Sequence, residues 1–421
     1  MAAVNNMMSR RWMRSETTFQ PGPRGTPEPR MVPAPNVPLH PVVSVATFTG
    51  AGSETAPAII DHGEAEFVTA GRIAIARALQ LMDIRAGDEV LVPAYHCPAM
   101  TEPIVWLSSV PVFYRLNEDL TPDLADAARK VTPRTRAIMG VHFFGFPQPL
   151  DELRGFADVH RLKLIEDCSH SFFGSWHGRP LGSAGDFTIG SLTKFFPVRD
   201  GGCLIVASQA AEVRHPNLRA QGAFATVRAS LDTVEDSIEF SRLSGLAPAS
   251  WAMRRAKRAV RRVLPAEPNE STNPAQRRSG AGGEFDGTWI DVRISSPSLV
   301  IARRAARARI VSRRRRHYRR LTEALTGIRG SRPINTDLPE GVVPYMFPFW
   351  IDDLERRFPI FEDRAIPMHR FGQFLSRHID ASICPVSVGY ARNLLQLPCH
   401  QELNDDEIEH IIDLVRGALA A

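Results

Sequence analysis

An acid and a lysine near the middle of the chain, Asp167 and Lys194, each follow a short apolar run. Lys194 closes the turn Ser191-Leu192-Thr193-Lys194, and Asp167 ends the run that begins at Leu162. Pyridoxal phosphate (PLP) needs both residue types, because a lysine amine forms a Schiff base with its aldehyde and a carboxylate keeps its pyridine nitrogen protonated. A hydroxyl three residues before the lysine is suited to the cofactor phosphate. The sequence therefore predicts a PLP site with Lys194, Asp167 and Ser191.

Short apolar segments around this pair are predicted to be strands. They are Lys163–Asp167, Asp186–Ser191 and Gly201–Val206. Ligands of open α/β sheets bind at the carboxyl ends of such strands, which is where Asp167 falls. Taken singly, an Asp at a strand end is usually a turn former and a Lys is usually a solvated charge. The prediction depends on finding both in this setting.

Five segments that follow one another along the chain carry a family resemblance: Gly87–Met100, Pro111–Leu116, Thr132–Pro147, Leu162–Gly202 and Leu394–Val415. In this order they resemble segments of the DegT/DnrJ/StrS sugar aminotransferases, a family of fold-type I PLP enzymes, and the similarity begins at about Glu66. The last segment is similar to the family's "LPxHxxL" loop and final helix. The resemblance implies that Lys194 is the Schiff-base lysine, Asp167 the pyridine partner and Ser191 a phosphate ligand. It also implies glutamate or glutamine as amino donor, a nucleotide-linked keto-sugar of polysaccharide biosynthesis as acceptor, and a homodimer.

The chain departs from this family at the start of its first helix. Ala70-Gly71-Arg72 stands where the family usually has Ser-Gly-Thr. Gly71 still lets the backbone approach a phosphate, and the N–H groups that begin the predicted helix Ile73–Met82 favour an anion. Arg72 either adds a direct charge to this cofactor-binding turn or points outward into solvent.

Two further departures concern the cofactor ring. His170 stands where the family commonly has Gln, and Cys97 falls where an aromatic ring normally stacks on the cofactor. Because a thiol cannot stack, His96 is predicted to take that role, with Tyr95 as the alternative. The competing interpretation is that both residues only pack where the strand Glu89–Pro93 ends. Lys194 also follows Ser191 by three residues rather than the family's usual five, so the chain is interpreted as a divergent member.

The whole chain has the composition of an ordinary globular protein. Its 421 residues, 43% hydrophobic and 23% charged, allow two domains with a large core. No apolar run approaches the roughly 18–20 residues of a membrane span, and the first residues lack a signal peptide's apolar stretch. The five cysteines are scattered without a C-x-x-C pair, which favours reduced thiols in the cytoplasm over disulfides or a zinc site.

The excess positive charge is concentrated in two runs, Arg254–Arg262 and Arg303–Arg320. Basic runs can bind nucleic acid. In the second run, apolar residues recur near helical spacing, which favours a helix over Ala306–Leu325 with its arginines on a solvated face. These apolar residues are Ile310, Val311, Tyr318, Leu321 and Leu325. The resemblance implies that this helix joins two domains, and no nucleic-acid partner is expected.

The predicted fold class is α/β: a fold-type I PLP-transferase with a large domain, whose mostly parallel sheet is flanked by helices, and a smaller C-terminal α/β domain. The expected divisions are 1–45, a disordered segment; 46–225, the large PLP-binding domain; 226–290, a basic insertion or linker; and 291–421, the small domain. The insertion contains a helix candidate, Ser250–Leu264, for which Trp251 and the arginines leave a membrane-facing role open. The small domain is expected to contain a strand, Tyr345–Ile351, and a final helix, Asn404–Leu419, capped by Asn404 and Glu407.

Two rival functions remain at this point. One is a PLP-dependent sugar dehydratase, although family members that dehydrate usually lack the lysine. The other is a non-catalytic protein that keeps the fold for regulation or binding. His142 and His177 can be read as active-site bases, but packed or surface imidazoles are the more ordinary interpretation.

Overall fold

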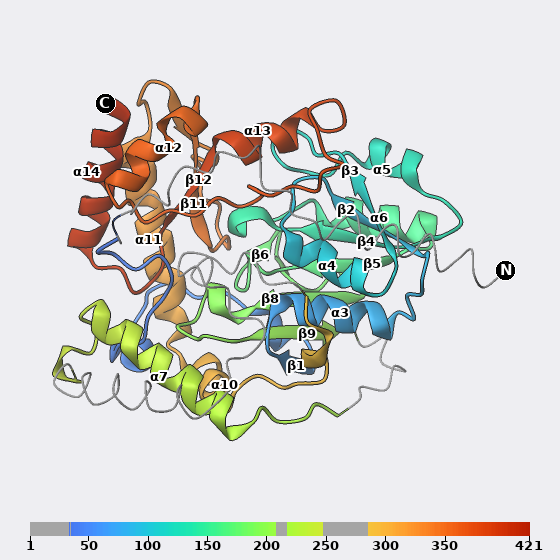
Figure 1. The fold of residues 1–421 in the computed structure, drawn as a ribbon, viewed down its shortest axis with the longest axis horizontal. Helices are drawn as coiled ribbons and strands as arrows, with labels where there is room; N and C mark the ends of the chain where they lie inside the picture. Colours follow the sequence, from blue (N-terminus) through green and yellow to red (C-terminus); the bar gives the residue numbers. More distant parts are fainter. Residues whose placement is uncertain (1–32, 34, 208–216, 247–284) are drawn as a thin grey trace, which may run out of the picture.

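A seven-stranded sheet organises the larger part of the chain (Figure 1). The computed structural model describes residues 33, 35–207, 217–246 and 285–421. The strands are β1 (Ala65–Val68), β2 (Glu89–Pro93), β3 (Val110–Tyr114), β4 (Thr135–Val141), β5 (Lys163–Asp167), β8 (Phe187–Ser191) and β9 (Gly202–Val206), in the order β1-β9-β8-β5-β4-β2-β3. From β3 to β8 the neighbours pair in parallel, whereas β9 pairs antiparallel with β8 and β1. A mostly parallel sheet was predicted and is confirmed.

The central strands are largely buried because helices cover the sheet. Strand β2 is buried at all five positions, and β5 is buried from Leu164 to Asp167. Parallel neighbours need crossover connections, and helices supply them. These helices are α3 (Gly71–Leu81), α4 (Pro98–Trp106), α5 (Leu124–Lys130) and α6 (Leu150–His160). The strands predicted around Asp167 and Lys194 are therefore confirmed to within one residue at each end.

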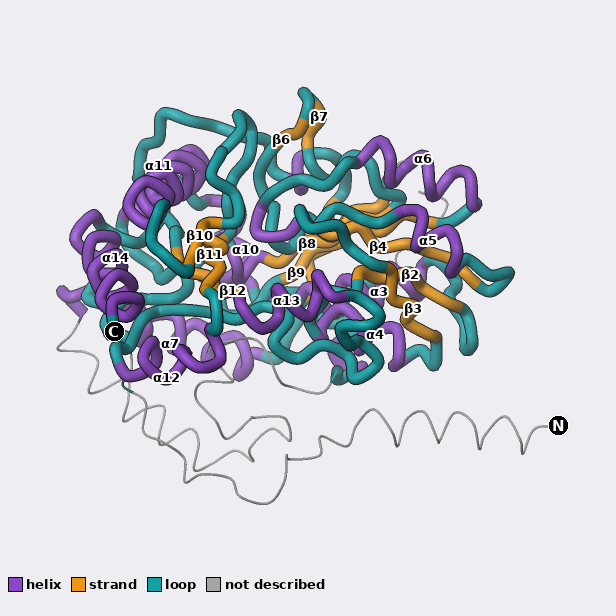
Figure 2. Tube along the Cα trace, turned by 90° about the horizontal axis from the view of Figure 1, so that it is seen from above, coloured by secondary structure: helices purple, strands orange, loops and turns teal. Residues whose placement is uncertain are grey.

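A second, three-stranded antiparallel sheet has the order β10-β11-β12. Its strands are β10 (Ser331–Pro333), β11 (Met346–Ile351) and β12 (Leu394–Pro398), with helices α11 (Arg307–Leu325), α12 (Leu354–Asp363), α13 (Pro385–Asn393) and α14 (Asp405–Ala420) around it. Figure 2 shows this sheet, with α11 and α14, beside the larger one. The predicted cap of the final helix is confirmed, because Asn404 and Glu407 form a reciprocal capping box.

The remaining elements are mostly short, apart from α7. They are α2 (Ala46–Thr49), η1 (Ile59–Asp61), η2 (Phe143–Gly145), β6 (Ser175–Trp176), β7 (Arg179–Pro180), η3 (Leu192–Lys194), α7 (Ala223–Glu239), η5 (Ser244–Leu246), η6 (Gly287–Trp289) and α10 (Ser296–Arg304). The predicted helix Ser250–Leu264 and most of the predicted linker fall outside the described residues. Among the helices of the described chain, none combines the length and the apolar composition of a membrane span.

Helix α11 joins the two parts of the molecule. Its first apolar residues, Ile310 and Val311, belong to a core cluster under the large sheet, whereas Tyr318 and Leu321 belong to the core of the small sheet. The predicted solvated face is wrong for three of its arginines. Arg309, Arg314 and Arg315 are buried, with exposed fractions of 9%, 0% and 6%. A helix packed on both sides buries such positions, and the long guanidinium side chain then reaches acceptors in both parts.

Residues 37–47, here termed the N-terminal strap, pack against the C-terminal part of the chain. Val37 belongs to the small-sheet core, and the Pro38 carbonyl accepts a hydrogen bond from His400 at 3.0 Å. The hydroxyls of Ser44 and Thr47 donate to the Glu402 carboxylate. The last residues of the segment expected to be disordered are thus packed, because they carry apolar side chains and satisfied hydrogen bonds. Residues 1–32 and 34 of that segment lie outside the described residues.

Candidate active site

The pairing of β5 with β8 brings the predicted residues to one edge of the large sheet. Asp167 is the last residue of β5 and lies beside Ile189 of β8. Strand β8 ends at Ser191, and the one-turn helix η3 that follows ends at Lys194. Because parallel strands end at the same edge, the carboxylate, the hydroxyl and the amine come together there.

Asp167 and Lys194 lie in a buried setting. The side chain of Asp167 is only 4% exposed, and its Oδ1 accepts a hydrogen bond from the Ser169 N–H at 2.8 Å. Burial lowers the pKa of the Lys194 amine below its ordinary value, while interactions with Cys97 and Asp167 act in the opposite direction. A larger share of this amine is therefore neutral and nucleophilic than of a solvated lysine.

Aromatic rings line the lysine on one side. The Nζ atom of Lys194 lies 5.4 Å from the centre of the Tyr345 ring, and this ring stacks on His170 with centroids 4.8 Å apart. His170 Nδ1 accepts a hydrogen bond from the Phe144 N–H at 3.3 Å. Burial, reinforced by the charge of Lys194, lowers the pKa of His170 well below its ordinary value. The imidazole is therefore neutral and carries its proton on Nε2, where it can donate.

The start of α3 faces two serines. A Cβ atom added at Gly71 would lie 3.5 Å from Ser169 Oγ and 3.6 Å from Ser191 Cβ. Ala70 is the N-cap of α3 and provides no side-chain cap for the first N–H groups. N–H groups at a helix start, beside hydroxyls, are donors suited to binding a phosphate. The structure thus brings Ala70, Gly71 and Ser191 together, as the sequence predicted.

Arg72 makes an ion pair with Glu102 of α4, with 3.0 Å between Nη1 and Oε2. Both side chains are partly buried, at 20% and 26% exposure. The sequence left open whether Arg72 adds its charge to the cofactor-binding turn or points outward into solvent. The structure matches neither alternative fully, because the partly buried guanidinium of α3 pairs with a carboxylate of α4. A role of Arg72 in phosphate binding stays a prediction.

Tyr95 and His96 are engaged away from the lysine turn. The Tyr95 hydroxyl donates to the Phe371 carbonyl at 2.8 Å, and its ring lies within an aromatic cluster. The His96 ring stacks on Phe113 with centroids 4.7 Å apart, while its Nδ1 donates to Ala94 O and its Nε2 accepts from Ser376 N–H. These contacts correspond to the packing interpretation of the two residues. The predicted stacking of His96 or Tyr95 on a cofactor is not tested by them.

A buried polar group lies behind β5. His142, Glu166 and Cys168 place ligand-type atoms within 4.8 Å of one another. The Glu166 carboxylate already accepts hydrogen bonds from His142 and from the N–H groups of residues 182, 184 and 185. Although burial raises the pKa of Glu166, these bonds outweigh burial and the pKa is lowered. With its lone pairs used in this way, the carboxylate anchors the loop after β7 rather than holding an ion. His177, the other histidine considered as a base, is exposed and stacks on Trp176.

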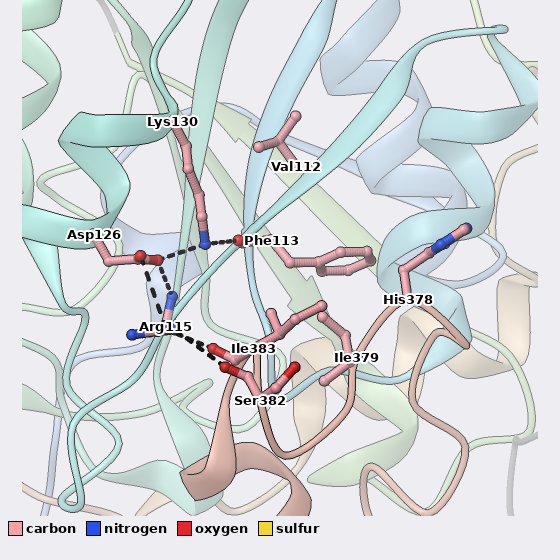
Figure 3. A pocket seen from close by; sticks show the side chains of 9 residues that line it. All are labelled: Val112, Phe113, Arg115, Asp126, Lys130, His378, Ile379, Ser382 and Ile383. Atoms are coloured by element: carbon pink, nitrogen blue, oxygen red, sulfur yellow. Dashed lines mark hydrogen bonds and ion pairs between the residues drawn. The ribbon is translucent and has the colours of Figure 1, made fainter.

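A separate pocket lies where β3 and α5 meet the segment before α13 (Figure 3). It is lined by Val112, Phe113, Arg115, Asp126, Lys130, His378, Ile379, Ser382 and Ile383. Figure 3 shows Arg115 and Lys130 directed at Asp126, and Arg115 also donates to two carbonyls of the opposite wall. Its two strong cations are therefore already engaged, and the remaining lining is largely apolar.

The sequence reasoning missed two residues of the lysine site. Ser169 follows Asp167 by two positions, so its place in the same turn was a usable signal. Tyr345 carried no such signal, because it comes from the distant segment before β11 and reaches the site only through the packing of the two sheets.

Comparison with known proteins finds a family that part of the chain resembles. Residues 56–236 match the model of the DegT/DnrJ/EryC1/StrS aminotransferase family. Over these residues, which make up less than half of the chain, the sequence is similar to this family. The matched residues contain the strands and turns that carry Asp167, Lys194 and the start of α3, so the predicted resemblance is confirmed.

Relatives within this family share about a third of the aligned residues. The chain is 32% identical, over 163 residues, to UDP-N-acetyl-3-dehydro-α-D-glucosamine 3-aminotransferase of Acidithiobacillus ferrooxidans. This alignment covers 37% of this chain and 43% of that protein. The chain is 34% identical over 160 residues to L-glutamine:scyllo-inosose aminotransferase of Streptomyces griseus, covering 37% of each. The aligned part thus spans less than half the length of each relative.

Solved structures extend the likeness of fold over the whole chain. The structure of DesV of S. venezuelae in complex with a ketimine intermediate aligns with a TM-score of 0.57 at 19% identity, covering 100% of this chain and 95% of that one. The predicted fold class, a fold-type I PLP-transferase, is confirmed. The donor set described above fits PLP chemically: it offers one amine, one carboxylate, and hydroxyls beside a helix start.

Proposed function

We propose that this protein is a PLP-dependent aminotransferase that moves an amino group from glutamate or glutamine to a keto-sugar. The observation that carries the proposal is the convergence of Lys194, Asp167, Ser191 and the start of α3 at one edge of the large sheet. When bound, PLP supplies an aldehyde for the lysine amine and a protonated ring that withdraws electrons from the carbon beside a substrate amine.

Asp167 and Lys194 have complementary roles in this proposal. The Asp167 carboxylate, fixed by the Ser169 N–H, holds the proton on the pyridine nitrogen. The Lys194 amine would hold the aldehyde of PLP and would be the base that takes the proton from the substrate α-carbon. A lowered pKa suits the lysine to this work, because its Nζ is then available as a base near neutral pH.

The phosphate is assigned to Ser191, Ser169 and the first N–H groups of α3, whose backbone approach depends on Gly71. His170 is assigned to orienting the cofactor, since its neutral ring can donate a hydrogen bond from Nε2 and stacks on Tyr345. The names of the relatives support the substrates: one acts with L-glutamine on scyllo-inosose, and the other on a UDP-linked 3-dehydro sugar. A homodimer and a cytoplasmic location stay predictions.

A non-catalytic PLP-fold binding protein is the second candidate. One observation favours it: the position expected for a stacking ring is Cys97, and Tyr95 and His96 are engaged elsewhere. The two candidates differ in whether an amino donor is turned over. A protein of the second kind would bind the cofactor without transferring its amine.

Borohydride reduction of the purified, PLP-loaded protein tests the proposal. The chain has four lysines, at positions 130, 163, 194 and 257, so a reduced adduct is assigned unambiguously by peptide mass spectrometry. We expect visible absorbance that borohydride bleaches, with the adduct on Lys194 and none in Lys194→Ala. An adduct on another lysine, or none after PLP is supplied, contradicts the site.

Addition of glutamate or glutamine then separates the two candidates. An aminotransferase releases one keto acid per site and loses its visible absorbance, and a keto-sugar restores it. Full cofactor binding on Lys194 with no keto acid released from either donor identifies a binding protein instead.

A further inference from the structure

Arg314 of α11 is completely buried and reaches the backbone of the lysine turn. Its Nη2 donates to the Lys194 carbonyl at 2.9 Å. Its Nη1 donates to the carbonyls of Tyr345 at 2.8 Å and Pro344 at 3.2 Å, and its Nε donates to Gln401 Oε1 at 2.9 Å. One planar group therefore connects the lysine turn, the segment before β11 and the loop after β12.

The buried charge of Arg314 is held without an ion pair in this set of contacts. All four hydrogen bonds end on neutral oxygens, and the guanidinium lies 4.4 Å from the centre of the Phe195 ring. Burial lowers the pKa of Arg314 to about 10. A neighbouring residue, Arg309, instead pairs with the Glu402 carboxylate. Burying a charge in this way is costly, and a well-packed apolar side chain usually serves stability as well. An apolar side chain, however, cannot provide the planar set of N–H donors that a guanidinium has.

Two of the acceptors of Arg314 belong to residues that face each other at the proposed site. Lys194 carries the amine, and the Tyr345 ring lies 5.4 Å from that amine. Gln401 extends the connection, because its Nε2 donates to the carbonyl of Phe195, the residue after the lysine, at 2.8 Å. Arg314 and Gln401 together hold two successive backbone carbonyls, those of Lys194 and Phe195.

We propose that Arg314, oriented by Gln401, is a positioning residue for Lys194. It fixes the backbone carbonyls of Lys194 and of Tyr345, whose ring lies beside the amine, so that Nζ keeps its buried place. This inference rests on the proposed function for its chemical meaning. Since α11 packs on both cores, it also makes the lysine depend on the placement of the small sheet.

The test follows Lys194 in the cofactor-free protein by pH-dependent amine labelling, resolved by peptide mass spectrometry. Arg314→Met keeps volume but removes the donors, and Gln401→Leu removes the group that orients Arg314. The matched control is Arg315→Met: Arg315 is also buried in α11 and donates to two carbonyls, those of Pro339 and Val342. Lys163, which is 53% exposed, serves as an internal reference in every variant.

We expect the labelling midpoint of Lys194 to move to higher pH in Arg314→Met, and in the same direction by less in Gln401→Leu. The midpoint in Arg315→Met and that of Lys163 should stay unchanged. With PLP and a donor, kcat should fall on the order of 10-fold in Arg314→Met with little change in KM, because the amine is misplaced only at the reacting atom.

An unchanged Lys194 midpoint in both variants overturns the inference, as does an equal shift in Arg315→Met. If Arg314→Met does not fold, Gln401→Leu decides the matter by its midpoint alone. The outcome is separable from the proposed function. If borohydride fixes no cofactor on Lys194 of the parent protein, the function fails, while the labelling midpoints still report whether Arg314 positions the amine.

Discussion

Glu166 and Asp167 are neighbours in sequence, yet their carboxylates serve opposite faces of the large sheet. Successive side chains of a strand point to opposite faces. Glu166 binds His142 and the backbone of residues 182–185, whereas Asp167 lies with Ser169, Cys97 and Lys194. The two acids are chemically alike, so replacing each by its amide should distinguish their roles: Glu166 in stability and Asp167 in the reaction.

Asp167→Asn should leave the fold and PLP binding in place but slow the half-reaction with an amino donor by on the order of 10²-fold, about 3 kcal/mol in the barrier. The amide has the same shape but carries no charge to hold a protonated pyridine. Stopped-flow absorbance after mixing with glutamate measures the rate. Near-normal turnover would mean that another group faces the ring nitrogen.

Glu166→Gln should instead lower the free energy of unfolding by about 3 kcal/mol, because several donors that now share one carboxylate would face an amide NH₂. Urea denaturation followed by circular dichroism measures the change. Protein that remains folded should react with the donor at a rate close to that of the parent. Full stability combined with lost reactivity would assign Glu166 to the reaction.

Gly202→Ala should weaken PLP binding on the order of 10-fold, ~1.4 kcal/mol. The added Cβ would clash with the Ala70 carbonyl group and lie 2.6 Å from the Gly71 nitrogen, so the start of α3 must move. Fluorescence titration with PLP and with pyridoxal, which lacks the phosphate, measures both affinities. The loss should be confined to PLP. Gly155→Ala is the control, since its Cβ meets nothing within 4 Å; equal losses for both ligands would argue against a phosphate site at this helix start.

His96 should contribute a pH dependence to stability. Burial lowers its pKa to about 4, from an ordinary value of about 6.5. Between these values the unfolded chain binds the proton more readily, so stability is complete above about pH 6.5 and is lost as the pH falls toward 4. Near pH 5 the slope from this one group is about 1 kcal/mol per pH unit. Urea unfolding of the parent and of His96→Gln at several pH values measures the difference in slope; identical slopes would contradict a buried, neutral His96.

The carboxyl ends of the strands were predictable because the signal is local. Apolar runs of about five residues defined β2, β5 and β8, and the edge rule then placed Asp167 and Ser191 together. The same rule could not foresee Tyr345, whose contact with Lys194 depends on how two sheets pack.

Arg314 illustrates a signal that was present but not used. The apolar residues Ile310 and Tyr318 are eight positions apart, and Arg314 occupies the helical position midway between them, on the same face. Hydropathy alone assigns an arginine to solvent. Its burial follows from carbonyl acceptors contributed by Lys194, Pro344 and Tyr345, which the sequence of the helix does not contain.

The N-terminal strap has a consequence for the order of folding. Its contacts with His400 and Glu402 join residues 355 to 362 positions apart in sequence. On the ribosome, the strap emerges more than 350 residues before His400 and Glu402, so Val37 cannot complete its contacts until that later segment has been made. Contacts of such range close late and slowly. The small-sheet core is therefore expected to complete late in folding, and refolding should show its slowest phase in probes placed on Val37 or Glu402.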